Sequence, residues 1–177
     1  MGMDIHIHIE YRSKRNGEWR CGDYFKINYE PYGDEPKFEP VEICGERNYH
    51  RFAVLADMKN DFNVIPISEA RGLPSDVSED VKAMADRYSH FATSWLTFEE
   101  IGQYLNTHTE KMGEKYEDRE GNKISSLLFR PDINVLADTI YKRATELKVL
   151  SDSYFNWVDC WTYENCSNVR IVFWFDV

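Results

Sequence analysis

The sequence has no apolar run long enough to cross a membrane, and its first residues lack the basic and apolar segments of a secretory signal peptide. Basic residues are in the minority, with 21 lysines and arginines against 31 aspartates and glutamates and a net charge of -10. Non-specific binding to nucleic acids depends on basic side chains that neutralise phosphates, so this charge balance argues against it. We therefore expect a cytoplasmic protein that binds neither membranes nor, non-specifically, nucleic acids.

Cysteine is also scarce, and the four cysteines form no Cys-x-x-Cys pair: Cys21, Cys44, Cys160 and Cys166. The spacing of the last two matches no common zinc-binding pattern. Because the chain shows neither a signal peptide nor a dense disulfide framework, we expect all four to be reduced thiols.

Two strands are predicted at the ends of the chain. Residues 4–10 alternate strictly between apolar and polar side chains, which is typical of a strand. One face holds the isoleucines Ile5, Ile7 and Ile9, and the other holds Asp4, His6, His8 and Glu10. Residues 169–176 alternate in the same way, with Val169, Ile171, Phe173 and Phe175 on the apolar face. An Asn16-Gly17 turn predicts that residues 18–21 return as a further strand.

Helical periodicity fills the middle of the chain, over residues 47–58, 78–88, 97–105 and 132–149. Prolines among acidic residues predict a long loop over 28–46, and an aromatic segment suggests a short strand around 157–163. Because the strands do not alternate with the helices, we expect an α+β fold. The expected architecture is a single domain over 1–177, with a small antiparallel or mixed sheet that contains both terminal strands and is covered by about four helices.

The polar face of the first strand carries the leading candidates for chemistry. Side chains on the same face of a strand follow each other at ~6.5–7 Å, so Asp4 and His6 can converge on one ion or ligand, with His8 next to them. Carboxylate and imidazole both bind divalent metals, and a bound metal can activate water for hydrolysis. Asp4 and His6 are thus candidates for catalysis and metal binding, and all three are candidates for ligand binding. A solvent-exposed face that is merely polar is the alternative.

Four other positions complete the candidate ligand-binding set together with His90. Arg71 lies in a tight turn and offers a planar fork to a carboxylate or phosphate, unless it forms a salt bridge that holds its own loop. Arg47 and Asn48 begin a helix, where free backbone N–H groups favour anions. Trp95 can stack on a ligand, although anchoring the core is its alternative use.

Five short motifs follow one another along almost the whole chain: Gly2-Met3-Asp4-Ile5-His6, Arg47-Asn48-Tyr49, Arg71-Gly72-Leu73-Pro74, Ser94-Trp95-Leu96-Thr97 and Val172-Phe173-Trp174-Phe175-Asp176. This ordered set resembles a family of small proteins that are frequent in phages and prophages. The family usually has cysteine where this chain has Met3, and the surroundings of His90 also depart from the family pattern. The resemblance implies an accessory role in a host cytoplasm rather than a particular reaction.

Three functions remain open on the sequence. The first is a phage-type accessory protein that binds and sequesters a small host molecule, for example a nucleotide immune messenger, in counter-defence. The second is a metal-dependent phosphoesterase that acts on a nucleotide, with Asp4 and His6 at its centre and a divalent metal as cofactor. The third is a protein-binding accessory factor. A homo-oligomer is compatible with all three, and we expect Asp4 and His6 to serve function rather than stability.

Overall fold

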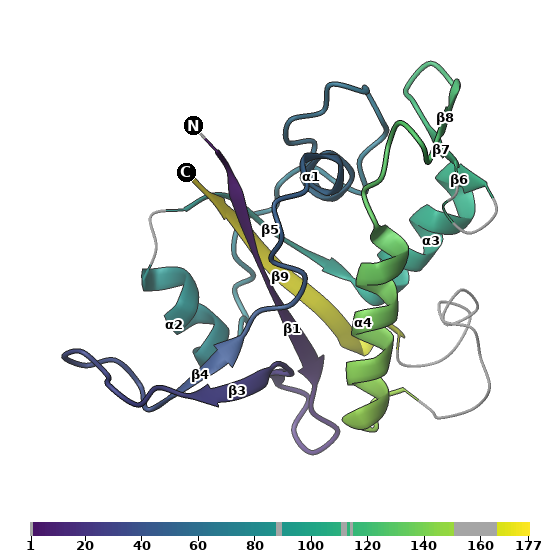
Figure 1. The fold of residues 1–177 in the computed structure, drawn as a ribbon. Helices are drawn as coiled ribbons and strands as arrows, with labels where there is room; N and C mark the ends of the chain where they lie inside the picture. Colours follow the sequence, from purple (N-terminus) through teal and green to yellow (C-terminus); the bar gives the residue numbers. More distant parts are fainter. Residues whose placement is uncertain (1, 88–89, 111–112, 114, 151–165) are drawn as a thin grey trace.

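A computed structural model describes residues 2–87, 90–110, 113, 115–150 and 166–177 of the chain. Its main sheet has four strands in the order β2-β1-β9-β5, and every neighbouring pair is antiparallel. The two terminal strands, β1 (Asp4–Arg12) and β9 (Val169–Asp176), lie side by side at its centre, flanked by β2 (Trp19–Cys21) and β5 (Phe91–Thr97) (Figure 1). The prediction of an α+β domain with both terminal strands in one sheet is confirmed.

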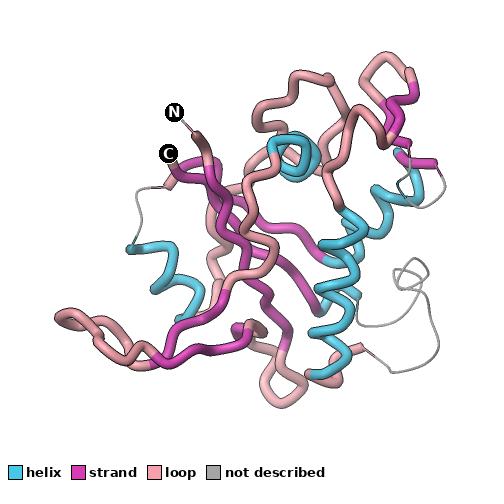
Figure 2. Tube along the Cα trace, in the orientation of Figure 1, coloured by secondary structure: helices cyan, strands magenta, loops and turns pink. Residues whose placement is uncertain are grey.

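Three of the four helices in the described part of the chain pack on the isoleucine face of this sheet. They are α1 (Tyr49–Ala56), α3 (Phe98–His108) and α4 (Ile133–Glu146). Phe52, Ile101 and Leu136 from these helices join Ile7 and Phe173 in the main hydrophobic core. Figure 2 shows the fourth helix, α2 (Glu79–Arg87), on the other side of the central strands. No helix in the described residues is long and apolar enough to span a membrane.

The polar face of β1 is buried at His8 and Glu10 and half exposed at Asp4, so the alternative of a solvent-exposed face is wrong for its second half. His8, Glu10 and Arg170 are at most 2% exposed. The physical reason lies in β9, whose polar-face positions include Val172 and Trp174, because these side chains give α2 an apolar surface to pack on. Both faces of the sheet thus carry a core, and polar residues on the second face need partners inside the protein.

A two-stranded arm leaves the body of the domain. Its strands are β3 (Tyr24–Ile27) and β4 (Phe38–Val41), which pair antiparallel with each other. The predicted loop over 28–46 is therefore wrong for residues 38–41. Pro40 is tolerated in this strand because the arm stands outside the main sheet, where a missing N–H costs no central ladder bond.

The remaining described elements are short. Strands β6 (Thr109–Glu110), β7 (Lys115–Glu117) and β8 (Lys123–Ser125) form a small separate sheet, and a 3-10 turn (Cys166–Asn168) precedes β9. The strand expected around 157–163 lies outside the described residues. Cys21 and Cys44 are free thiols, but Cys166 is disulfide-bonded, so the expectation of four reduced thiols is wrong for Cys166.

Candidate functional site

Each polar side chain on the second face of β1 has a charged partner from another element. At the start of the strand, the Arg47 guanidinium donates to both carboxylate oxygens of Asp4, over 2.8 and 2.9 Å. This bidentate hydrogen bond lowers the pKa of Asp4 below its usual value. Asp4 and Arg47, both candidates for ligand binding, are therefore partners of each other.

His6 lies between two carboxylates. Its Nδ1 is 2.7 Å from Glu42 Oε2 and its Nε2 is 3.0 Å from Asp176 Oδ2. The hydrogen bonds to Glu42 and Asp176 raise the pKa of His6 to about 9, against the opposing effect of burial. The ring is thus an imidazolium at neutral pH, with both nitrogens acting as donors. A metal ligand or general base needs a neutral ring nitrogen, so either role would require His6 to lose a proton and a carboxylate partner.

Farther along β1 the pairs are fully buried. His8 Nδ1 lies 2.7 Å from Asp23 Oδ2, and both side chains are at most 1% exposed. Arg170 Nε donates to Glu10 Oε2 over 2.6 Å, and the same guanidinium reaches Asp76 Oδ1 at 2.9 Å. Buried charges need such partners because their desolvation is costly.

Three of the predicted histidines gather around Trp174. The distance between ring centroids is 5.0 Å for His8 and 5.8 Å for both His6 and His90. His90 also shares a hydrogen bond of 2.8 Å with the Thr93 hydroxyl. The described residues contain no group of three or more His, Cys, Asp or Glu side chains placed to hold a metal. The His6 and His8 rings stack on Trp174, and the His90 ring is tilted against it.

Arg71 and Trp95 form a separate group near β5. The Arg71 guanidinium lies 4.9 Å from the Trp95 ring centroid and forms an ion pair of 2.5 Å with Glu100. Asn48 caps α1, where its Oδ1 accepts from the Arg51 backbone N–H at 3.0 Å. The predicted ligand set is thus divided among several places, and the planar forks of Arg47 and Arg71 are already occupied by carboxylates.

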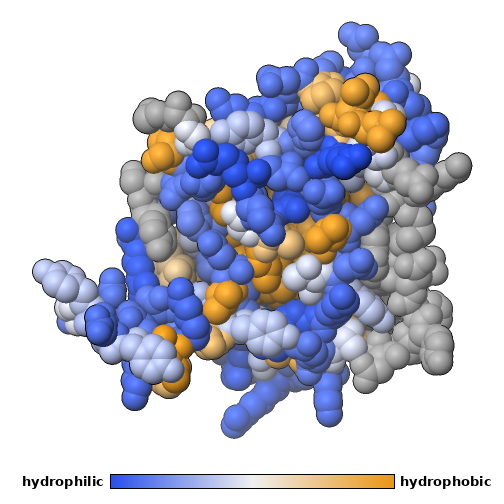
Figure 3. Space-filling view, viewed as in Figure 1, coloured by the Kyte–Doolittle hydropathy of each residue, from blue (hydrophilic) through white to orange (hydrophobic). Residues whose placement is uncertain are grey.

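The β3–β4 arm carries the exposed aromatic residues that sequence reasoning missed. Tyr29 and Tyr32 are 85% and 88% exposed, and Phe25, Ile27 and Phe38 are 44–53% exposed. Figure 3 shows apolar side chains on the surface where the arm leaves the body. The density of aromatic residues between 24 and 38 is a signal of an interaction surface in the sequence. The prolines and acidic residues in the same stretch favour a loop, and they outweigh that signal.

No protein-family model, curated protein or solved structure matches this chain. The resemblance to the phage and prophage family stays a prediction that depends on the five motifs.

Proposed function

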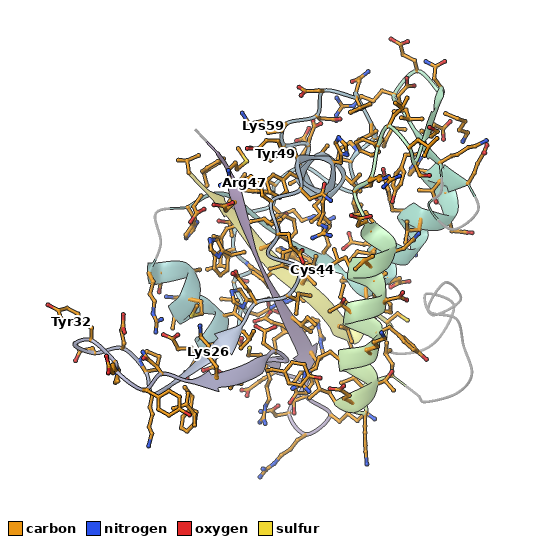
Figure 4. The ribbon with its side chains drawn as sticks, viewed as in Figure 1. Lys26, Tyr32, Cys44, Arg47, Tyr49 and Lys59 are labelled. Atoms are coloured by element: carbon orange, nitrogen blue, oxygen red, sulfur yellow. The ribbon has the colours of Figure 1, made fainter. Side chains whose placement is uncertain are left out.

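We propose that this chain is a protein-binding accessory factor of the phage type and that the β3–β4 arm is its docking element. The observation that carries the proposal is the exposure of an apolar and aromatic surface on an element that projects from the body; Figure 4 labels Tyr32 at its tip. Exposed apolar patches on soluble proteins mark interaction sites, and aromatic residues are enriched at protein interfaces. A two-stranded hairpin alone is only marginally stable in water, so a partner that covers it also stabilises it.

The net charge of the chain favours a protein over a nucleic acid or a membrane as the partner. A net charge of -10 opposes binding to the phosphates of nucleic acids and to anionic membrane surfaces. Sequestration of a small anion would require Arg47 or Arg71 to leave Asp4 or Glu100. A phosphoesterase would likewise require His6 to release two carboxylates. Both stay untested predictions, whereas docking through the arm breaks no contact present in the fold.

A capture experiment with a matched control tests the proposal. The immobilised chain is incubated with a bacterial lysate, and each captured protein is purified and titrated against the free chain. The double variant Phe25→Ser/Phe38→Ser removes the exposed apolar face of the arm. We expect this variant to lose about tenfold or more in affinity, because truncation of an interface hot spot costs at least 1–2 kcal/mol.

The control variant is Leu127→Ser/Leu128→Ser, which removes two apolar residues that are more exposed than Phe25 and Phe38 and lie in a different loop. Its affinity is expected to match that of the unmodified chain, and thermal unfolding checks that both variants are folded. Equal binding by the arm variant and the unmodified chain, with the control also unchanged, would overturn the proposal.

A further inference from the structure

Resting on the proposed function, we propose that the arm binds its partner by β-strand addition at the outer edge of β3. The occupant is an extended protein segment with apolar residues at its centre and a basic residue at the end that meets the tip of the arm. Strand addition supplies main-chain hydrogen bonds for affinity, and side chains at alternate positions supply specificity.

The edge of β3 is open, whereas the edge of β4 is protected. Within the described part of the chain, the two strands pair only with each other. Strand β4 lies beside α2, where Arg87 forms an ion pair of 2.7 Å with Glu39, and it contains Pro40, which lacks an N–H. All four residues of β3 are exposed and none is proline. Charged contacts and proline are the usual protection of a sheet edge. Strand β3 has no proline, but Arg143 and Glu146 of α4 contact Tyr24 at its start. Lys26 forms an ion pair of 4.0 Å with Glu39, so the open part of the edge lies at Phe25 and Ile27.

The hydrogen-bond register identifies the free groups on this edge. The Asn28 N–H donates to the Lys37 carbonyl oxygen over 2.8 Å, so these residues form a hydrogen-bonded pair. Such pairs alternate with non-hydrogen-bonded pairs along an antiparallel ladder. The Ile27 and Phe38 pair and the Phe25 and Pro40 pair are therefore non-hydrogen-bonded. It follows that the N–H and C=O groups of Phe25 and Ile27 point away from β4, toward the incoming strand.

Side chains on the arm define the chemistry of the occupant at its centre. By register, Phe25 and Ile27 share one face of the ribbon with Phe38 and Pro40. The first three are 44–53% exposed. A segment that adds to β3 therefore extends this face if its own central residues are apolar, because cross-strand apolar pairs stabilise a sheet.

The tip of the arm selects basic residues at the end of the segment. Residues 28–36 contain Glu30, Asp34 and Glu35 and no lysine or arginine. The Tyr32 backbone N–H and the Asn28 side chain lower the pKa of Glu35, so this carboxylate is ionised and held in position. Asp34, Glu35 and Tyr32 line an open surface hollow of about 640 Å³. Arg87 of α2 lies at the same hollow and is paired with Glu39, so Asp34 and Glu35 are the carboxylates offered to a basic side chain of the segment.

A second copy of this chain fits the edge less well. Two arms that pair through β3 bring their acidic tips or their acidic bodies together, and each chain has a net charge of -10. Like charges placed opposite each other destabilise an interface. This repulsion favours a basic partner over self-association.

The test uses a defined probe on the full chain. One peptide has the core Val-Thr-Val-Thr with arginines at both ends, so that either strand direction places a basic residue at the tip, and its twin has glutamates instead. Binding is followed by NMR of the labelled chain. We expect the basic peptide to shift the amide signals of Phe25 and Ile27 and the acidic twin to shift none. The variant Ile27→Pro removes one outward N–H and should weaken binding about fivefold, the loss of one net hydrogen bond.

Ile27→Pro could unfold the arm, and the amide signal of Asn28 reports whether it does. In that case a charge variant with a matched control replaces it as the test. Asp34→Asn/Glu35→Gln should lower the affinity for the basic peptide about fivefold or more, because the charge pairing between these carboxylates and the arginine is lost. Asp61→Asn/Glu120→Gln changes the net charge equally at a distance from the arm and should have no effect.

Three outcomes overturn strand addition. The first is that the peptide shifts amide signals away from β3, and the second is that both charge variants weaken peptide binding equally. The third is that the free chain sediments as a dimer in which the β3 amides are protected. The proposed function fails separately, when Phe25→Ser/Phe38→Ser retains the captured protein. A third combination separates the two proposals. If Phe25→Ser/Phe38→Ser loses the captured protein but Ile27→Pro does not change peptide binding, the arm remains the docking element and only strand addition at the β3 edge is refuted.

Discussion

At the scale of the residue, the polar face of β1 is a series of ion pairs that hold different elements to the central strand. His6 joins the base of the arm through Glu42 and the C-terminal strand through Asp176. Glu10 is bound by Arg170 from the neighbouring strand. The sequence shows that these positions are polar and share a face. It does not show their partners, because Glu42 and Arg170 are brought to β1 only by the tertiary fold.

The raised pKa of His6, about 9 against an ordinary value of 6.5, predicts a pH-dependent stability. Because the folded-state pKa is higher than the unfolded-state pKa, the stabilisation is fully present below pH 6.5 and is lost as the pH rises through 9. We expect the contribution of His6 to the free energy of unfolding to fall by about 1–3 kcal/mol over that window. Denaturant unfolding at a series of pH values measures it.

The variant His6→Gln provides the background, since glutamine does not titrate and other groups change charge in the same range. The unmodified chain should lose more stability than His6→Gln as the pH rises. Parallel pH profiles for the two proteins would contradict the account of the two carboxylates around His6.

At the scale of the element, the structures that could be predicted are those with a local signal. The terminal strands follow from strict alternation, and α3 follows from the helical periodicity of residues 97–105; in the structure Thr97 and Glu100 form a capping box at its start. The arm could not be predicted in the same way. Its strands have four residues each, one contains Pro40, and neither is amphipathic against the main core. What stabilises the arm is its register and its few contacts with α2 and α4, which are tertiary.

The capping box of α3 gives a prediction at this scale. The Thr97 hydroxyl accepts from the Glu100 N–H at 3.1 Å, and the Thr97 N–H donates to Glu100 Oε2 at 2.8 Å. Thr97→Ala should lower the free energy of unfolding by about 1 kcal/mol, because it leaves a helix N–H without its partner. Thr107→Ala, in the same helix, removes no cap and should be neutral or slightly stabilising. Equal effects of the two variants in denaturant unfolding would refute this role for Thr97.

At the scale of the whole molecule, the motifs behind the phage-family resemblance contact one another. The Tyr49 hydroxyl accepts from the Met3 N–H at 3.2 Å, and a Cβ on Gly2 would lie 2.0 Å from the Arg47 guanidinium. The Arg71 N–H likewise donates to the Ser94 hydroxyl at 3.1 Å. Such contacts explain why the motifs occur together without a shared ligand. Under the proposed function, the molecule has two separate tasks: the motifs stabilise the body and the arm binds a partner.

The separation of these two tasks is tested most directly by a crossed comparison of His6→Gln with Phe25→Ser/Phe38→Ser. For each protein, the free energy of unfolding at pH 7 and the affinity for the captured partner are measured side by side. His6→Gln should lower stability by about 1–3 kcal/mol, as the pKa shift implies, and leave the affinity unchanged. The arm variant should keep its stability, because its two side chains are half exposed, and lose the partner. The reverse pattern, a stable His6→Gln that no longer binds and an arm variant that binds normally, would contradict the account and place function on the polar face of β1.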